Sequence, residues 1–390
     1  MTQLLRIACF GLSACVLILL AQPAVSAQHT EATTSSTSPV AIVYVSHPSA
    51  NSATAPNNIL AWSANAQGKL TPVSGSAFTG NVIPMAVNGK YLFGGSQDGS
   101  SIDTFLMSST GALKQVDSIN AQKYLSGTCD QVIHLTLDHT GATLYSYAGY
   151  FGPGCATDTT WQSFKIDQAN GSLSYLGSAG HSTSWNYPLR FIGDNVFAFE
   201  GSGTDIYGFR RESDGMLVHA TTTSYRPAGP NGETYNAEGV AADPTNHLAV
   251  VLQPNGSGST QLATYTANNS GYLSTSSTAA NMPKVSIGSP FYSAMSPSGK
   301  LLAVGGSAGL QVFHFNGSSP ITHYTGLLTT TPIAQMYWDN DNHLYAISTS
   351  VEGKLYVFTV TPTGYAQAPG SPYSVFDPMA IIVQPKTAKP

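Results

Sequence analysis

The chain has 390 residues, of which 42% are hydrophobic and only 9% are charged, against roughly 25% charged residues in an average soluble domain. This length and hydrophobic content suffice for one large core or two smaller ones, and solubility must rest on uncharged polar residues. A net charge of −5, with no run of Lys or Arg after Arg6, excludes the electrostatic surface that nucleic-acid binding needs.

The first 27 residues predict a secretory signal peptide. Arg6 precedes an apolar run over residues 7–20, and a small-x-small cleavage pattern ends at Ala27. A membrane anchor is the alternative, but a spanning helix needs about 20 apolar residues, which this run does not reach. We therefore expect an exported protein, periplasmic or extracellular, with no transmembrane segment after the signal is removed.

Two further features of this region bear on anchoring. The segment Leu12–Cys15 (LSAC) resembles a lipoprotein box, but it lies in the middle of the apolar run, which favours export without a lipid on Cys15. Residues 28–40 are rich in Ser and Thr and predict a flexible spacer.

From residue 41 onwards the chain repeats one pattern about every 40 to 55 residues. The pattern begins with a turn and an apolar strand, as in PSGKLLAVGG at residues 297–306. The six turns of this kind contain Gly89, Gly141, Asp194, Asn246, Gly299 and Asn342. A strand with an aromatic residue follows, and then a polar turn that usually leads into Gly-x-Leu. This second half occurs seven times, and we assign its aromatic residues to the core: Trp62, Phe105, Phe164, Phe209, Tyr265, Phe313 and Phe358.

Periods of this length that hold several short strands apiece are typical of a β-propeller. Each unit predicts four antiparallel strands: one before the first turn, one after it, one with the aromatic residue and one from Gly-x-Leu onwards. No segment has a convincing helical period. The predicted fold class is therefore all-β, a seven-bladed β-propeller of four-stranded antiparallel blades.

The two ends of the repeat predict how the ring closes. The first unit lacks an innermost strand, because AIVYVSH at residues 41–47 is typical of the second strand of a blade. The segment PMAIIVQP at residues 378–385 supplies the missing strand, so that N- and C-terminal strands share one blade and no free sheet edge remains. We expect the propeller over residues 41–385 and a C-terminal tail over residues 386–390.

Seven units with a P-x-G-x-x-L turn and an I-x-x-F strand before G-x-L resemble the lactonase-type seven-bladed β-propellers, which include 6-phosphogluconolactonase-like and YVTN-repeat proteins. The resemblance implies the fold, which serves both enzymes and binding proteins. The enzymes tend to carry a G-P-R-H segment. Here His134 takes the place of the histidine, Val132 and Ile133 precede it, and no S-N-R segment occurs. A phosphorylated substrate would also need clustered Arg or Lys.

Long, varied connections point to the mouth of the central channel as the site. They are longest at residues 147–160 and 224–238, on the face where the chain enters the innermost strands. His134, Arg190 and Glu238 enter the innermost strands of the third, fourth and fifth blades, so we expect them to converge there. As catalytic residues, Glu238 or His134 would hold a water as general base, and Arg190 would face the developing oxyanion of a lactone.

The same face carries candidate ligand-binding residues: Trp185, Tyr187, Glu200, Tyr235 and Tyr292. All of these residues have a structural alternative. His134 can bond a neighbouring loop, Arg190 can pair with Glu200, and the aromatic rings can pack between blades.

The cysteines and the short motifs indicate whether the chain can form a disulfide or bind a metal ion. Cys9 and Cys15 belong to the signal peptide, which leaves Cys129 and Cys155 in the mature chain. Both are expected on connections of the third blade on one face, and export favours oxidation, so we predict a disulfide between them. No His-x-x-x-His spacing, EF-hand or P-loop occurs, and we expect no metal and no cofactor.

Two classes of function remain open. The first is an exported, monomeric propeller that binds a small molecule, a carbohydrate or a surface protein at the channel mouth, with no nucleic-acid partner. The second is a lactonase-like hydrolase that opens a sugar lactone or another lactone by general-base catalysis. The missing enzyme motifs and the low charge favour the first class, and the sequence leaves open whether the chain is an enzyme.

Overall fold

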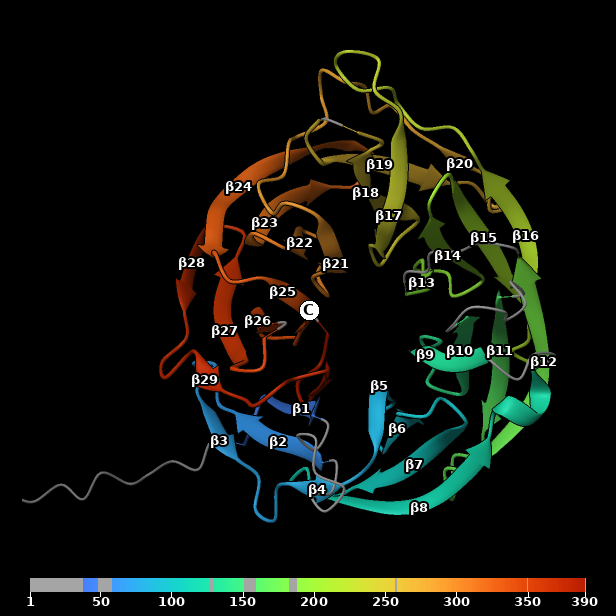
Figure 1. Cartoon of the computed structure of the whole chain (residues 1–390), viewed down its shortest axis with the longest axis vertical. Coiled ribbons are helices and arrows are strands. Elements are labelled where there is room, and N and C mark those ends of the chain that lie inside the picture. The colour runs from blue at the N-terminus through green and yellow to red at the C-terminus, as the bar shows by residue number, and fades with distance from the viewer. Residues whose placement is uncertain are drawn as a thin grey trace, which may run out of the picture. The chain divides into compact units, whose positions relative to one another are not determined.

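The computed structural model describes residues 38–47, 58–125, 130–150, 159–181, 188–256, 258–348 and 350–389. They belong to one compact unit, Thr37–Pro390. Seven antiparallel sheets form the blades of a ring in this unit (Figure 1). Within the described ranges one short helical element occurs, the 3-10 turn η1 (Gln122–Tyr124). The predicted all-β, seven-bladed propeller is confirmed.

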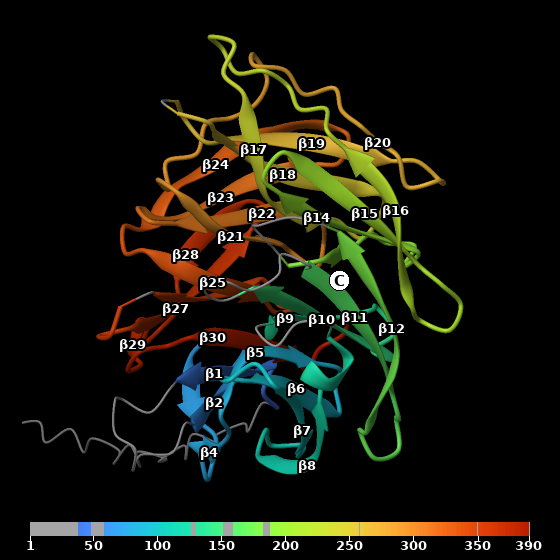
Figure 2. The same ribbon diagram turned by 45° about the vertical axis from the view of Figure 1, so that its right-hand side comes forward.

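The first blade combines strands from both ends of the propeller. Its order is β3 (Leu70–Pro72), β2 (Asn58–Ala64), β1 (Ala41–His47) and β30 (Ala380–Pro385), with β4 (Phe78–Thr79) beside β2. Strand β1 pairs with β30 from Ala41 opposite Pro385 to Ser46 opposite Ala380. Figure 2 shows β1 in blue beside β30 in red. The predicted closure of the ring by a C-terminal strand is confirmed.

Each of the other six blades uses consecutive strands, and the first strand of each is the innermost one. The second blade contains β5 (Val82–Val87), β6 (Tyr91–Ser96), β7 (Ser101–Met107) and β8 (Leu113–Asn120). The third contains β9 (Asp130–Leu137), β10 (Thr143–Tyr150), β11 (Thr159–Ile166) and β12 (Leu173–His181). The fourth contains β13 (Arg190–Phe191), β14 (Phe197–Ser202), β15 (Asp205–Arg211) and β16 (Leu217–Thr223).

The remaining three blades complete the ring. The fifth contains β17 (Tyr235–Ala242), β18 (His247–Pro254), β19 (Gln261–Ala267) and β20 (Leu273–Ser274). The sixth contains β21 (Pro290–Met295), β22 (Leu301–Gly306), β23 (Gly309–Asn316) and β24 (Ser319–Thr329). The seventh contains β25 (Ile333–Trp338), β26 (His343–Ser348), β27 (Lys354–Thr361) and β28 (Gly364–Gln367), with β29 (Tyr373–Ser374) beside β27.

Hydrophobic packing between neighbouring blades holds the ring together. The described core residues fall into clusters that each join two adjacent blades, and every interface of the ring has its own cluster. In β22, Leu302 and Val304 pack toward the fifth blade, whereas Leu301 and Ala303 pack toward the seventh. Such a strand is buried on both faces, and therefore its sequence is a continuous apolar run rather than an alternating one.

The predicted core aromatics occupy equivalent places on the third strands of the blades. Six of them are at most 2% exposed: Phe105, Phe164, Phe209, Tyr265, Phe313 and Phe358. Trp62 differs, because it is only half-buried and packs at the border of the cluster between the first and seventh blades.

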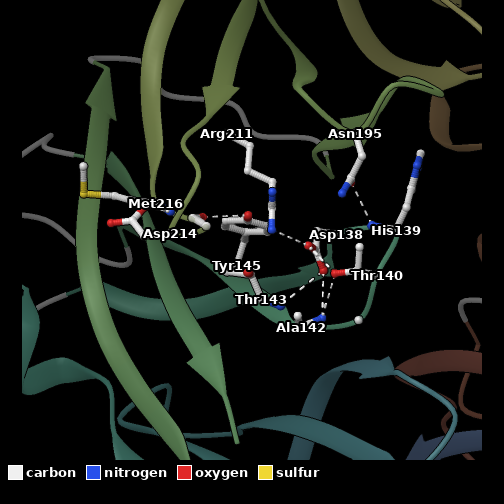
Figure 3. A network of polar contacts seen from close by, with 12 residues as sticks. Asp138, His139, Thr140, Ala142, Thr143, Tyr145, Asn195, Arg211, Asp214 and Met216 are labelled. Atoms are coloured by element: carbon white, nitrogen blue, oxygen red, sulfur yellow. Dashed lines mark hydrogen bonds and ion pairs between the residues drawn. The ribbon is translucent and has the colours of Figure 1, made fainter. Parts of the chain in front are cut away.

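A buried ion pair joins the third and fourth blades on the side of the turns between first and second strands (Figure 3). Nη2 of Arg211, in β15, lies 3.0 Å from the Asp138 carboxylate, and the two side chains are 20% and 0% exposed. The carboxylate also accepts hydrogen bonds from the N–H groups of Ala142 and Thr143, at 2.9 and 3.2 Å, and from the Thr140 hydroxyl at 2.8 Å. These donors stabilise a carboxylate that would otherwise be costly to bury.

Gly193→Ala is expected to lower the free energy of unfolding by about 1–3 kcal/mol, because it forces the fourth and fifth blades apart. A Cβ at Gly193 would lie 1.9 Å from the carbonyl oxygen of Pro244, and the Gly193 N–H donates to the carbonyl of Thr245. Gly326→Ala is the matched control, because a Cβ there meets nothing within 4 Å. Urea denaturation measures both variants, and equal midpoints would contradict the expectation.

Several predictions about the N-terminus and the cysteines concern residues that the structure does not describe. These are the signal peptide (residues 1–27), most of the spacer, and the pair Cys129 and Cys155. They stay predictions, as do the domain bounds and export. In the described part of the chain, no helix is long and apolar enough to cross a bilayer.

Candidate functional site

The innermost strands enclose a cavity of about 220 Å³ near the axis of the propeller. Its wall comes from β5, β9, β21, β25 and β30 and from Pro188, just before β13. Most of these residues lie in the first halves of their strands, on the side where the chain enters each blade, whereas His134 lies near the middle of β9 and Tyr337 near the end of β25. We call it the entry-side cavity. It is on the face where the sequence predicts the site.

The wall of the entry-side cavity is mainly apolar. Among its described lining residues, the polar ones are His134, Tyr292, Gln335 and Tyr337, and none is a carboxylate, a lysine or an arginine. Phe291 and Met379 also line it and remain 40% and 41% exposed, which makes an apolar rim. An apolar cavity with a few polar groups is the usual form of a small-molecule site, although this one is smaller than the roughly 300–1,000 Å³ of drug-sized pockets.

A chain of hydrogen bonds across the axis forms the floor of this cavity. Nη2 of Arg190 donates to the Tyr292 hydroxyl at 2.8 Å, and the guanidinium lies 5.3 Å from the Tyr292 ring centroid. The Tyr292 hydroxyl donates in turn to the Tyr337 hydroxyl at 3.1 Å. Because the three residues come from the fourth, sixth and seventh blades, the chain ties together three separate innermost strands.

The hydroxyl of Tyr337 is held as a neutral group by its surroundings. Burial raises its pKa well above the ordinary value of a tyrosine, and Tyr292 raises the pKa further, while Arg190 lowers it. Gln335 is hydrogen-bonded to Tyr337. The Gln335 Oε1 also accepts the N–H of Ile381 in β30 at 2.8 Å, which fixes the amide at the junction of the seventh and first blades.

His134 reaches the cavity from β9 with aromatic packing behind it. It stands opposite Tyr147 of β10, and the two ring centroids are 6.3 Å apart. Tyr147 packs edge-on against Trp161 at 5.1 Å. The Trp161 Nε1–H donates to Oε2 of Glu200 at 2.7 Å, and Glu200 is fully buried between the third and fourth blades. Glu200 therefore belongs to the packing that supports His134 and not to the described cavity wall.

A second cavity, of about 200 Å³, lies on the other side of Tyr292 and Tyr337. Most of its residues come from the ends of β17, β21 and β25, next to the turns that lead into the second strands, and we call it the hairpin-side cavity; Arg190 joins them from β13. Tyr292 and Tyr337 line both cavities. Arg190 lines only this second one among the described walls, and therefore reaches the entry-side cavity through Tyr292.

The structure places the predicted site residues in different surroundings. His134 and Tyr292 line the entry-side cavity, whereas Arg190 lines the hairpin-side cavity. Glu238 lies at a bulge of β17 between Ala237 and Val240, and the described wall of neither cavity includes it.

Of the three other predicted ligand-binding residues, the structure describes one, Tyr235. Tyr235 is 2% exposed in the core of the fifth blade, where its hydroxyl donates to Oε1 of Gln261. This packing leaves its ring no face for a ligand. Trp185 and Tyr187 lie outside the described residues.

Gln335 and Tyr337, which provide two of the polar groups of the cavity, were not predicted from the sequence. Both come from IAQMYW, the innermost strand of the seventh blade. The signal that could have found them is the presence of polar side chains in an innermost strand that must be buried on both sides. Among the described residues, the cavity wall included, no group of three His, Cys, Asp or Glu side chains could hold a metal ion.

Comparisons with known proteins extend this description only at the level of fold. No family model and no curated protein matches the sequence. A Bacteroides uniformis protein, provisionally assigned as a 6-phosphogluconolactonase, is 12% identical with a TM-score of 0.63, over 89% of this chain and 100% of that one. A Lactobacillus plantarum protein is 13% identical with a TM-score of 0.63, over 89% of this chain and 99% of the other.

A third solved structure is similar over a smaller part of the chain. The periplasmic gluconolactonase of Pseudomonas aeruginosa is 19% identical with a TM-score of 0.52, over 72% of this chain and 80% of its own. Identities this low show a shared architecture and do not carry an activity. The chain therefore has the fold of the lactonase-like seven-bladed β-propellers.

Proposed function

We propose that the chain is an exported binding protein for a small, uncharged and largely apolar molecule, which it holds in the entry-side cavity. The observation that carries this proposal is the composition of the described wall, which is apolar apart from His134, Tyr292, Gln335 and Tyr337. A charged ligand would need a counter-charge at this depth. A phosphorylated sugar fits poorly, because none of the described lining residues is an arginine or a lysine.

The signal-like N-terminus supports the export part of this proposal. The size of the cavity supports a small ligand rather than a polymer or a protein surface. Its volume of about 220 Å³ is below the roughly 300–1,000 Å³ of pockets for drug-sized ligands.

Ala334→Phe is expected to weaken ligand binding at least tenfold, because Ala334 lines the cavity and a phenyl ring would fill much of it. The matched control is Ala366→Phe, on the exposed strand β28 of the same blade. Isothermal titration with delta-valerolactone measures both variants against the unsubstituted chain, and gluconolactone, which is uncharged but strongly polar, is the comparison. Equal delta-valerolactone affinities in the two variants, or no saturable binding of delta-valerolactone to the unsubstituted chain, would contradict the proposal.

A second candidate function is lactone hydrolysis, supported by the presence of His134 in the cavity together with the likeness in fold to a gluconolactonase. His134 would take a proton from a water that attacks the lactone carbonyl. The tetrahedral intermediate would then break its ring C–O bond, and the protonated His134 would return the proton to the leaving oxygen, giving a hydroxy acid. Gln335 and Tyr337 stand across the ring from His134, where they could bond the carbonyl oxygen.

His134→Gln separates these two functions. If the chain is a hydrolase, the substitution is expected to lower kcat about 10²–10⁴-fold, because a glutamine cannot act as a base. If the chain only binds, lactones stay intact with both proteins and the affinity changes little. Acid release in a pH-stat, corrected for spontaneous hydrolysis, measures the rates. Rates that equal the spontaneous rate for every lactone would rule out the hydrolase.

A further inference from the structure

The hairpin-side cavity contains a cation, Arg190, that has no acidic partner among the residues that the structure describes. It is lined by Arg190 together with Tyr292, Tyr337 and Trp338, and by small or apolar residues such as Ala242 and Ala294. In the part of the chain that the structure describes, the side-chain hydrogen bond and the ring contact of Arg190 are both with Tyr292, and Tyr337 is a further electrostatic neighbour. We propose that this cavity is a binding site for a small organic monocarboxylate, held by Arg190.

The charge of Arg190 is only partly compensated by the described residues. Arg190 is half-buried, and a guanidinium that is partly removed from bulk water is costly unless an anion or several acceptors compensate it. One tyrosine hydroxyl accepts a hydrogen bond from Arg190, which leaves most of its five N–H donors for another acceptor. A bound anion would supply both the charge and the missing acceptors.

Acidic residues near this end of the ring are engaged elsewhere. Asp243 lies 3.1 Å from Nδ1 of His247 and accepts hydrogen bonds within its own turn. Asp339 lies 2.7 Å from Nδ1 of His343 in the same way. Asp138 pairs with Arg211, as described above. None of these carboxylates forms an ion pair with Arg190, and among the described residues no carboxylate contributes to its electrostatic surroundings, so the cation is available to a ligand there.

The chemistry of the cavity selects the class of anion. The planar fork of a guanidinium matches the two oxygens of a carboxylate. A single cation balances one negative charge, and a phosphate dianion would remain half uncompensated. The alanine, methionine and aromatic side chains of the wall favour a ligand with a short hydrocarbon part over a bare halide. A volume of about 200 Å³ limits that part to a few carbon atoms.

The site is separate from the one proposed above, because the Tyr292 and Tyr337 side chains stand between the two cavities. It opens next to the turns of the fifth, sixth and seventh blades, and Pro297 of the sixth-blade turn contributes to its wall. The proposal therefore holds whether or not a lactone or another neutral molecule binds on the entry side.

Sodium propionate is the probe for this site, measured by isothermal titration at low ionic strength. We expect saturable binding, with a parallel shift of one fluorine resonance when the chain is labelled with 5-fluorotryptophan. The chain has four tryptophans, and Trp338, assigned with Trp338→Phe, lines this cavity. The resonance of Trp161, packed between the third and fourth blades, is expected to stay in place.

Variants of two arginines in the fourth blade test the role of the guanidinium. Arg190→Met is expected to weaken propionate binding at least tenfold, and Arg190→Lys, which keeps the charge without the fork, to weaken it less. Arg210→Met is the matched control, because Arg210 is 53% exposed and should leave the affinity unchanged. If Arg190→Met fails to fold, Ala294→Leu gives the same test, because the larger side chain occupies the cavity and should abolish binding.

Three results would overturn the proposal. The first is the absence of saturable binding or of a shift at Trp338. The second is equal propionate affinity in Arg190→Met and Arg210→Met. The third is binding of sodium chloride or inorganic phosphate as tight as that of propionate, which would show that the cavity does not select an organic carboxylate.

Discussion

Ending the chain at Asp377 is expected to abolish cooperative folding of the propeller and to produce aggregates. The truncation removes β30, which pairs with β1 along six residues. Ile381 and Val383 belong to the cluster between the seventh and first blades, and Ile382 to the cluster between the first and second. Burial of three such side chains contributes on the order of 5–9 kcal/mol, which is comparable with the total stability of about 5–15 kcal/mol of a typical protein.

The truncation also exposes the edge of β1 that pairs with β30 in the complete chain. Strand β1 would become the innermost strand of an open blade, and its unpaired N–H and C=O groups could pair with another chain. Size-exclusion chromatography and thermal unfolding measure the outcome. The control ends the chain at Lys386, which keeps β30 and removes only the tail whose Thr387 carbonyl accepts a hydrogen bond from Asn340. A truncated chain that stays monomeric and unfolds at the unchanged temperature would show that β30 does not close the ring.

Arg211→Met is expected to lower the free energy of unfolding by about 2–4 kcal/mol. It leaves the Asp138 carboxylate, which is fully buried, without its cation, and breaking a buried pair typically costs about 3–5 kcal/mol. We place the expected loss slightly lower because Arg211 is 20% exposed and water can replace part of its contact. Urea denaturation at neutral pH is the measurement.

Neighbouring Arg210 provides the control for this substitution. It pairs with Glu212 at 2.6 Å, but the two side chains are 53% and 35% exposed, and surface pairs are typically worth about 0–1 kcal/mol. Arg210→Met should therefore unfold at nearly the midpoint of the unsubstituted chain. The double variant Asp138→Asn with Arg211→Met should be less destabilised than the sum of its parts, because no buried charge is then left unpaired. A loss as small for Arg211→Met as for Arg210→Met would contradict this account.

The repeat explains why the fold could be predicted in such detail. Gly299 and Asn342 lie in turns where the backbone needs positive φ, with values of 66° and 65°. The residue types that favour such turns can be recognised from a few neighbouring positions in the sequence. The aromatic of each third strand, such as Phe313, recurs because each blade buries it against its neighbour in the same way. Trp62 is only half-buried because it lies at the border of its cluster rather than within it. The repeat pattern alone does not predict this difference in burial.

The entry-side cavity lies on the face where the sequence predicts a site, but which side chains line it depends on packing. Innermost strands converge near the axis, but their register decides which side chains meet there. In β25 the pairing shifts between Ile333 and Gln335, and both Gln335 and Tyr337 line the cavity. Arg190 and Tyr292 are 102 residues apart in sequence, yet they share a hydrogen bond across the ring. Spacing along one strand contains no information about such a contact.

The sequence alone determined the class of the protein, the number of blades, the pairing of the two end strands and the face on which connections are long. All of these follow from local turn chemistry and from a hydrophobic period that every blade repeats. Only the tertiary structure decided that His134 and Arg190 serve different cavities, because the tyrosines between them come from two other blades. It also decided that Tyr235 belongs to the core rather than to a binding surface. Whether a side chain on an innermost strand meets a ligand or a neighbouring blade depends on the twist and stagger of seven sheets about a common axis, which no single strand encodes.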